Sequence, residues 1–265
     1  MKNIMITGAG SGIGYYLVRQ LLTDGYNVTV LDVDTDNLGD LCSRYDSLLT
    51  MACDVRDFAR MKACAEQSAG RFGSIDCAIH NACLCTFRSM TDTDEQTYRD
   101  VFDVNYYGAL HLTRAVLPYM KRQGGGKVIF TSSGVGVMGF VDISPYASSK
   151  GAIEALAKCL NIEHQGDGIS FHIFHPPLTR TKSAAPLPIP SEFMADPEEV
   201  GVGLAKRLRK KAFIICHSFG QRVQTLSCYL FPVKMGRLMS RLTAGYKEKQ
   251  AAQNGCDKET SLRSK

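Results

Sequence analysis

Tyr146 and Lys150 stand four residues apart in the segment PYASSKGAIEAL, and this pair could carry out acid–base chemistry. A helix here would place the phenol and the ammonium on one face, about one turn apart. A cation at that distance favours phenolate and would lower the pKa of Tyr146 towards neutral pH. A tyrosine tuned in this way can exchange a proton with the oxygen of a ketone or an alcohol. Because Tyr-x-x-x-Lys also arises by chance, the pair needs support from the rest of the chain.

A glycine-rich turn near the start of the chain could bind a phosphate group. An apolar strand expected at 3–7 runs into TGAGSGIG, and an amphipathic helix is expected at 13–24. Glycines let the backbone approach a pyrophosphate, and the helix N-terminus offers N–H donors and a positive dipole end. Gly8, Gly12 and Gly14 are separated by three residues and then by one, unlike the commonest dinucleotide fingerprint. The order strand, turn, helix still favours a dinucleotide site over a turn that only closes a strand–helix unit.

Alternating patterns along the rest of the chain predict a single α/β domain. Strands are expected near 3–7, 27–32, 48–53, 75–80, 127–132, 169–175 and 212–216. Helices are expected near 13–24, 57–71, 97–122, 147–164 and 197–210, with room for a short one after Asp32. This alternation indicates a Rossmann-like, doubly wound parallel sheet of about seven strands with helices on both faces. Ligands bind beyond the carboxyl ends of such strands, where Asp32, Asn81 and Ser133 are expected.

The composition is that of an ordinary globular protein, with 45% hydrophobic and 22% charged residues in a chain of 265. No stretch reaches the ~20 apolar residues of a membrane span. The first expected strand begins within three residues of Met1, which leaves no room for a targeting segment. The ten cysteines are scattered, which suggests reduced thiols, and no group of Cys and His has the spacing of a metal site. We therefore expect a cytoplasmic protein without a metal.

Together these features resemble the short-chain dehydrogenase/reductase family, whose members carry Thr-Gly-x-x-x-Gly-x-Gly and Tyr-x-x-x-Lys. The similarity runs from about residue 2 to about residue 215. It includes TGAGSGIG (7–14), Asp54-Val55, HNAC (80–83), VNYYG (104–108), SSGVG (132–136), YASSK (146–150) and HPPLTRT (175–181). The resemblance implies a nicotinamide cofactor, an oxidoreductase of alcohols or ketones, and a homo-oligomer.

The resemblance also implies a catalytic set of four residues. Ser133 would bond the substrate oxygen, and Tyr146 would act as acid or base. Lys150 would lower the pKa of Tyr146 and bond the nicotinamide ribose. Asn105 would kink the long helix and hold a proton-relay water beside Lys150. The structural alternatives are that Asn105 is a helix irregularity and that Ser133 is a turn residue.

Asp32 ends the second expected strand, eighteen residues after Gly14. A carboxylate there can accept hydrogen bonds from an adenosine ribose and would repel a 2′-phosphate. Neither Ser11 nor Val33 is basic, so NAD(H) is favoured over NADP(H), although Asp32 could be only a turn residue. The cofactor-binding residues that the resemblance implies are Gly8, Ser11, Gly12, Ile13, Gly14, Asp32, Asp54, Val55, Asn81, Ala82, Tyr146, Lys150, Pro176, Leu178, Thr179 and Thr181.

Two positions depart from the family pattern. Cys83 and Pro177 stand where most members have glycine, and the pair Pro176-Pro177 is similar to the ketosphinganine reductase branch. Six of the nine prolines lie between 176 and 197. With Leu178, Leu187, Ile189, Phe193 and Met194 they would form a stiff apolar flap over the site. Such a flap indicates a hydrophobic substrate such as a lipid ketone, a steroid or a long acyl chain, unless it merely packs on the body.

These features predict an NAD(H)-dependent oxidoreductase that interconverts a secondary alcohol and a ketone on a hydrophobic substrate. One alternative is an NADPH-dependent lipid-ketone reductase, acting on a 3-ketosphinganine-like or 3-oxoacyl substrate. Another, of a different class, is a non-catalytic dinucleotide-binding redox sensor. The presence of Ser133, Tyr146 and Lys150 argues against a sensor, which needs no tuned proton donor.

The C-terminal part of the chain is strongly basic, with eleven Lys and Arg against one acid between 201 and 250. Apolar residues recur there at helical spacing beside Lys234, Arg237 and Arg241, as in helices that lie on anionic membranes. Docking on the body or on a second subunit is the alternative, and no nucleic-acid motif accompanies the charge. The expected organisation is a dinucleotide-binding catalytic domain (1–220), a basic amphipathic extension (221–250) packed on that domain or on a membrane or partner, and a disordered tail (251–265).

Overall fold

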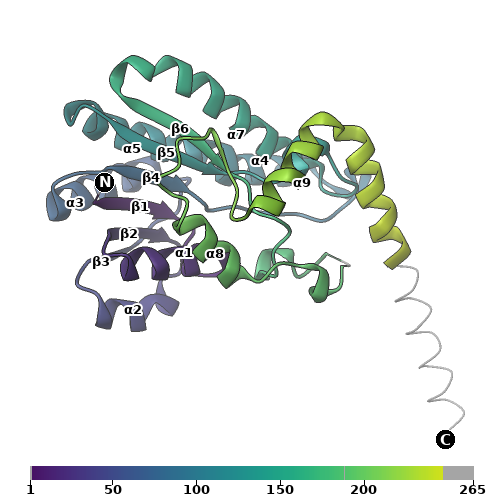
Figure 1. The fold of residues 1–265 in the computed structure, drawn as a ribbon, viewed down its shortest axis with the longest axis horizontal. Helices are drawn as coiled ribbons and strands as arrows, with labels where there is room; N and C mark the ends of the chain where they lie inside the picture. Colours follow the sequence, from purple (N-terminus) through teal and green to yellow (C-terminus); the bar gives the residue numbers. More distant parts are fainter. Residues whose placement is uncertain (1, 188, 247–265) are drawn as a thin grey trace, which may run out of the picture.

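Seven parallel strands form one sheet in the order β3-β2-β1-β4-β5-β6-β7 in the computed structural model, which describes residues 2–187 and 189–246 (Figure 1). The strands are β1 Asn3–Thr7, β2 Asn27–Asp32, β3 Leu48–Ala52, β4 Cys77–His80, β5 Gly126–Thr131, β6 Ile169–Phe174 and β7 Ile214–Ile215. Every pairing is parallel. The strand order reverses between β1 and β4, which opens the crevice where doubly wound sheets bind ligands. The expected fold class is confirmed.

Helices cover both faces of the sheet, as Figure 1 shows. They are α1 Gly12–Thr23, α2 Gly39–Arg44, α3 Phe58–Phe72, α4 Glu95–Phe102, α5 Gly108–Arg122, α6 Val135–Met138, α7 Ser144–Glu163, α8 Pro197–Ala205 and α9 Phe219–Leu230. α1 and α8 pack on one face, where Leu17 and Leu204 join one buried cluster. α3, α5 and α7 pack on the other face, where Leu112 and Ile153 join a second cluster. A parallel sheet buried in this way needs strands that are apolar on both sides.

Short polar side chains begin several of these helices. Asp57, Asp94, Asp196 and Ser218 each accept a backbone N–H from the first turn of α3, α4, α8 and α9, respectively. These N-caps satisfy donors that would otherwise lack a partner. The motif Ser218-Phe-Gly-Gln221 is a start signal that the sequence analysis did not use, and α9 was therefore not predicted.

The helix expected at 97–122 contains a segment of π-helix. α4 ends at Phe102, a π-helical segment covers Asp103–Tyr107, and α5 starts at Gly108. The kink expected at Asn105 therefore takes the form of a π-segment inside a continuous helix.

The C-terminal elements differ from expectation in length. The strand expected at 212–216 is only two residues long, and β7 pairs with β6 alone at the edge of the sheet. After α9, residues 232–246 are helical up to the end of the described chain. The expected boundary at 220 falls just inside α9, and the expected tail 251–265 lies outside the described residues. Within 2–187 and 189–246, the helices lack the length or the hydropathy needed to traverse a bilayer.

Candidate active site

A cleft of about 500 Å³ opens beyond the carboxyl ends of β1, β4, β5 and β6. The predicted residues that line it are Gly8, Ser11, Gly12, Ile13, Asp32, Asp54, Val55, Asn81, Ala82, Ser133, Tyr146, Lys150, Pro176, Leu178, Thr179 and Thr181. Two predicted residues, Gly14 and Asn105, are not part of its wall. The structure thus brings nearly the whole predicted set to one cleft.

The glycine turn fits a dinucleotide phosphate. Gly8 has a φ of +67°, and a Cβ there would lie 2.3 Å from Cα of Ala82, so only glycine is accommodated. A Cβ on Gly14 would lie 2.4 Å from the Gly8 carbonyl oxygen, so Gly14 serves packing of the turn. Ser11 precedes α1, and its side chain makes no capping hydrogen bond to the first turn. The first N–H groups of α1 can therefore donate hydrogen bonds to an anion.

Asp32 and Asp54 occupy the far end of the cleft. Asp32 accepts the Gly10 N–H at 2.7 Å and the Asp34 N–H at 3.2 Å, which fixes its carboxylate beside the glycine turn. Arg56, which the sequence analysis missed, also lines the cleft. Its Nε and Nη2 donate hydrogen bonds to the two carboxylate oxygens of Asp54. The hydrogen bonds from Arg56 hold the pKa of Asp54 below its ordinary value. Asp54 is therefore an anion already bound to a cation, whereas Asp32 keeps acceptor capacity for a ribose.

Asn81 joins the two strands at the reversal of the sheet. Its Nδ2 donates to the Gly8 carbonyl at 2.6 Å, and its backbone N–H lies 3.2 Å from the Thr7 hydroxyl. Thr7 in turn lies 3.0 Å from Nδ1 of His80. Burial lowers the pKa of His80 to about 3, so this imidazole is neutral. Thr7 and His80 are thus structural supports of the cleft that sequence reasoning missed.

Tyr146, Lys150 and Ser133 meet at the middle of the cleft. Lys150 is buried, donates from Nζ to the Thr131 carbonyl at 2.8 Å, and lies 5.6 Å from the centroid of the Tyr146 ring. Burial raises the pKa of Tyr146 well above its ordinary value, and a hydrogen bond with Ser133 acts in the opposite direction. Burial also lowers the pKa of Lys150.

The expectation that the pKa of Tyr146 is lowered towards neutral pH is wrong for the protein alone. Burial disfavours the charged phenolate and raises that pKa instead. Tyr146 is consequently a protonated phenol at neutral pH, which suits it to donate a proton.

Asn105 acts behind the cleft wall. Its Nδ2 donates to the Leu84 carbonyl at 3.0 Å and to the Ser149 hydroxyl at 2.8 Å, and its Oδ1 accepts the Leu84 N–H at 2.8 Å. The amide therefore joins the loop after β4 to α7, next to Lys150. Its contact with a relay water, implied by the family resemblance, stays a prediction.

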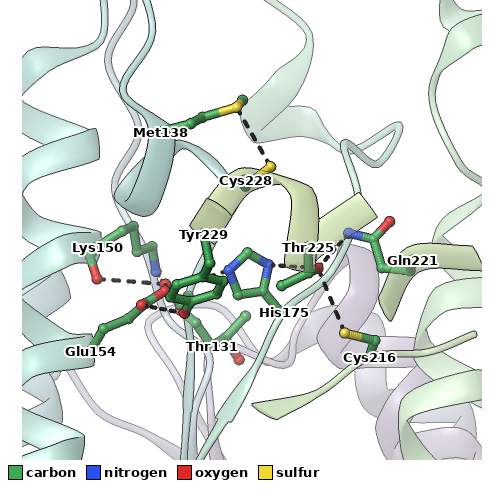
Figure 2. Close-up of polar contacts among 11 residues, drawn as sticks. Thr131, Met138, Lys150, Glu154, His175, Cys216, Gln221, Thr225, Cys228 and Tyr229 are labelled. Atoms are coloured by element: carbon green, nitrogen blue, oxygen red, sulfur yellow. Dashed lines mark hydrogen bonds and ion pairs between the residues drawn. The ribbon is translucent and has the colours of Figure 1, made fainter. Parts of the chain in front are cut away.

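A buried acid, Glu154, lies one helical turn after Lys150 and was missed by sequence reasoning. Its Oε1 accepts the Ser132 hydroxyl at 2.6 Å and lies 3.5 Å from Nε2 of His175, and its Oε2 accepts the Tyr229 hydroxyl at 2.6 Å (Figure 2). Burial alone would raise the pKa of Glu154, but the contacts with His175, Ser132 and Tyr229 outweigh it and lower that pKa. An acid at i+4 from the lysine, on the face that carries Tyr146, was the available signal.

The cleft becomes apolar beyond Tyr146. The apolar side chains that line this end are Leu84, Phe87, Met138, Phe140, Ile143, Leu187, Ile189, Met235 and Met239. Leu178, Leu187 and Ile189 of the expected flap belong to the wall, whereas Phe193 and Met194 do not. The ring of Phe193 instead packs at a tilt against the ring of Tyr246. The proline-rich segment therefore forms part of the cleft, as its composition suggested.

Comparisons with known proteins agree with this architecture. The family model for short chain dehydrogenases matches residues 2–189. The oxidoreductase UcpA of Salmonella typhimurium is 33% identical over 211 residues, which cover 78% of this chain and 80% of that protein. The 3-ketodihydrosphingosine reductase of Dictyostelium discoideum is 29% identical over 202 residues, 68% of this chain and 60% of that protein. The crystal structure of a short-chain dehydrogenase from Streptomyces avermitilis superposes with a TM-score of 0.77 at 25% identity, over 96% of this chain and 97% of that one.

Proposed function

The chain belongs to the short-chain dehydrogenase family and is an oxidoreductase acting on CH–OH groups, and on this basis we propose an NAD(H)-dependent enzyme that interconverts a secondary alcohol and a ketone on a hydrophobic substrate. The observation that carries the proposal is the grouping of Ser133, Tyr146 and Lys150 between a glycine turn and an apolar end of one cleft. A nicotinamide cofactor, when bound, supplies or accepts the hydride.

The three central side chains divide the remaining work. The Ser133 hydroxyl holds the substrate oxygen in hydrogen-bonding distance of the phenol. Tyr146 gives its proton to that oxygen during reduction of a ketone and takes it back during oxidation of an alcohol. Lys150 lies beside the phenol and stabilises the negative charge that forms as the proton leaves. Because burial raises the pKa of Tyr146, the phenol carries its proton at neutral pH and is in the form that can donate.

Asp32 supports the choice of NAD(H). Its carboxylate is fixed by Gly10 and Asp34 at the end of β2, where it would accept from a ribose and repel a 2′-phosphate. Arg56 lines this end of the cleft, but its charge is matched by Asp54. An enzyme built for a 2′-phosphate would need a cation that is free to meet it.

The second candidate is an NADPH-dependent lipid-ketone reductase. Similarity to a 3-ketodihydrosphingosine reductase and the pair Pro176-Pro177 favour it. It requires Arg56 to leave Asp54 and bind the 2′-phosphate. A non-catalytic redox sensor would bind the dinucleotide without turnover.

Steady-state rates with NADH and with NADPH, measured by nicotinamide absorbance on a panel of ketones, test the proposal. The panel contains a long-chain 3-oxoacyl ester, a sphingoid ketone, a steroid ketone and acetone as a small polar control. We expect turnover of a hydrophobic ketone with NADH and little with acetone. A strong preference for NADPH would support the second candidate, and dinucleotide binding with no turnover of any ketone would support the sensor.

A further inference from the structure

α9 and the helix 232–246 carry several exposed apolar side chains. These are Phe219, Val223, Leu226, Leu230, Phe231, Val233, Leu238 and Leu242, which we call the outer face. The first four are spaced as one face of α9, and on the next helix Val233 lies on one side of the basic residues and Leu238 and Leu242 lie on the other. Eight of the sixteen large hydrophobic side chains exposed in the described residues lie here, so exposed apolar surface is concentrated on these two helices.

The charged residues of the segment that carries the outer face are all basic. Arg222, Lys234, Arg237 and Arg241 are exposed beside it, and no Asp or Glu occurs between 219 and 246. Exposed apolar residues interleaved with Lys and Arg are the chemistry of helices that lie in the interface of an anionic bilayer. A symmetric contact between two copies would instead bring like charges together, which costs free energy.

The side of α9 opposite its exposed apolar residues belongs to the cleft, where Gln221, Thr225 and Cys228 line the wall. Met235 and Met239 of the next helix line the wall as well, on a face adjacent to Leu238 and Leu242. The helices are also held firmly. A Cβ on Gly236 would lie 2.6 Å from the Met138 carbonyl oxygen, and Tyr229 bonds to Glu154. The outer face is therefore presented by a docked part of the fold, which Figure 1 shows in yellow-green at the edge of the molecule.

We propose that the outer face docks on the surface of an anionic lipid bilayer. Its apolar side chains enter the boundary between headgroups and acyl chains, and its basic side chains contact the anionic headgroups. α9 presents the cleft wall on its inner side, and Met235 and Met239 of the next helix complete that wall, so docking brings the apolar end of the cleft close to the lipid. Delivery of a hydrophobic substrate by this route rests on the proposed function, whereas docking itself does not.

Co-sedimentation of the full chain with vesicles tests the docking. The vesicles are made of phosphatidylcholine, with or without phosphatidylserine, and contain no substrate, so the result is independent of turnover. We expect binding to the anionic vesicles that weakens with salt. Replacing the three basic residues together (Lys234→Gln, Arg237→Gln, Arg241→Gln) should lower the partition coefficient about 100-fold. Val223→Ser and Leu226→Ser should each lower it roughly tenfold.

Matched variants outside the outer face separate docking from general effects. Ile162→Ser replaces an apolar side chain on α7 that is 75% exposed. Arg44→Gln, Lys62→Gln and Lys158→Gln together remove the same charge from exposed positions elsewhere. Both should bind vesicles like the wild type, and thermal unfolding should show that all variants are folded. The inference is overturned if the wild type does not bind anionic vesicles, if the controls lose binding equally, or if Leu226→Ser only dissociates a dimer in light scattering.

Discussion

The Tyr229 hydroxyl donates a 2.6 Å hydrogen bond to Oε2 of Glu154 and thereby joins α9 to α7. The other oxygen of this carboxylate accepts the hydroxyl of Ser132, the neighbour of Ser133. One buried anion, 4% exposed, thus supports both the segment that carries Ser133 and the helix that covers the cleft. The positions of the Ser133 segment and of α9 should therefore be coupled through Glu154.

Tyr229→Phe should therefore destabilise the fold by about 1–3 kcal/mol, because a buried carboxylate loses a donor. The substrate KM should rise as α9 loosens, while the Kd for NADH stays unchanged. Tyr119→Phe on α5 is the control and should leave the stability, the KM and the Kd unchanged. In a Glu154→Gln background the same substitution should cost less, and equal costs in both backgrounds would rule out the coupling.

The same pair predicts a dependence of stability on pH. The pKa of Glu154 is lowered in the folded protein, so its ionisation stabilises the fold above the ordinary carboxyl pKa. That contribution is lost as pH falls through the folded-state pKa. Because Tyr229→Phe removes one of the contacts that lower this pKa, its destabilisation should be largest near neutral pH and shrink in acid. Thermal unfolding over a pH series measures the difference between the two proteins.

Tyr146→Phe should lower kcat for ketone reduction about 100-fold to 10,000-fold, since the proton donor is removed. Binding of NADH, measured by fluorescence titration, should be retained. Tyr16→Phe on α1 serves as the control. In the wild type, deprotonation of Tyr146 should not lower the rate of reduction until the pH exceeds ~10, because burial raises the pKa of Tyr146 above that ordinary value. Undiminished turnover in Tyr146→Phe would exclude the proposed proton path.

Gly8→Ala should abolish dinucleotide binding and destabilise the protein, since its Cβ would meet the backbone of Ala82. Gly25→Ala is a matched control: Gly25 also has a positive φ, of +81°, but open space surrounds its Cβ position. We expect that control to cost only about 1 kcal/mol and to bind NADH normally. Calorimetric titration and thermal unfolding distinguish the two, and similar behaviour of both variants would contradict the close approach at Gly8.

Asp32→Ser should shift the ratio of kcat/KM from NADH towards NADPH at least tenfold, about 1.4 kcal/mol, because the repulsion of a 2′-phosphate is removed while an acceptor remains. Asp34→Ser removes a carboxylate two residues further along and should leave the ratio unchanged. An unchanged ratio in Asp32→Ser would show that Asp32 does not select the cofactor.

Local patterns predicted the sheet well. β1 and β2 lie at the expected residues because buried parallel strands are continuous apolar runs, and the glycine turn follows from its order between strand and helix. Contacts between distant residues were not predictable in this way. Glu154 and Tyr229 are 75 residues apart, and nothing in either neighbourhood indicates the other. The pKa of Tyr146 was mispredicted for the same reason, since burial depends on the whole fold.

The π-segment Asp103–Tyr107 fixes how many residues the chain needs between α4 and α5. A π-turn accommodates one residue more than an α-turn. Deleting a single residue there would let α4 and α5 close into one ordinary helix without the bulge. The backbone that places Asn105 against Leu84 and Ser149 would then be lost. A change in residue count at this point should therefore harm the enzyme more than most substitutions that preserve it.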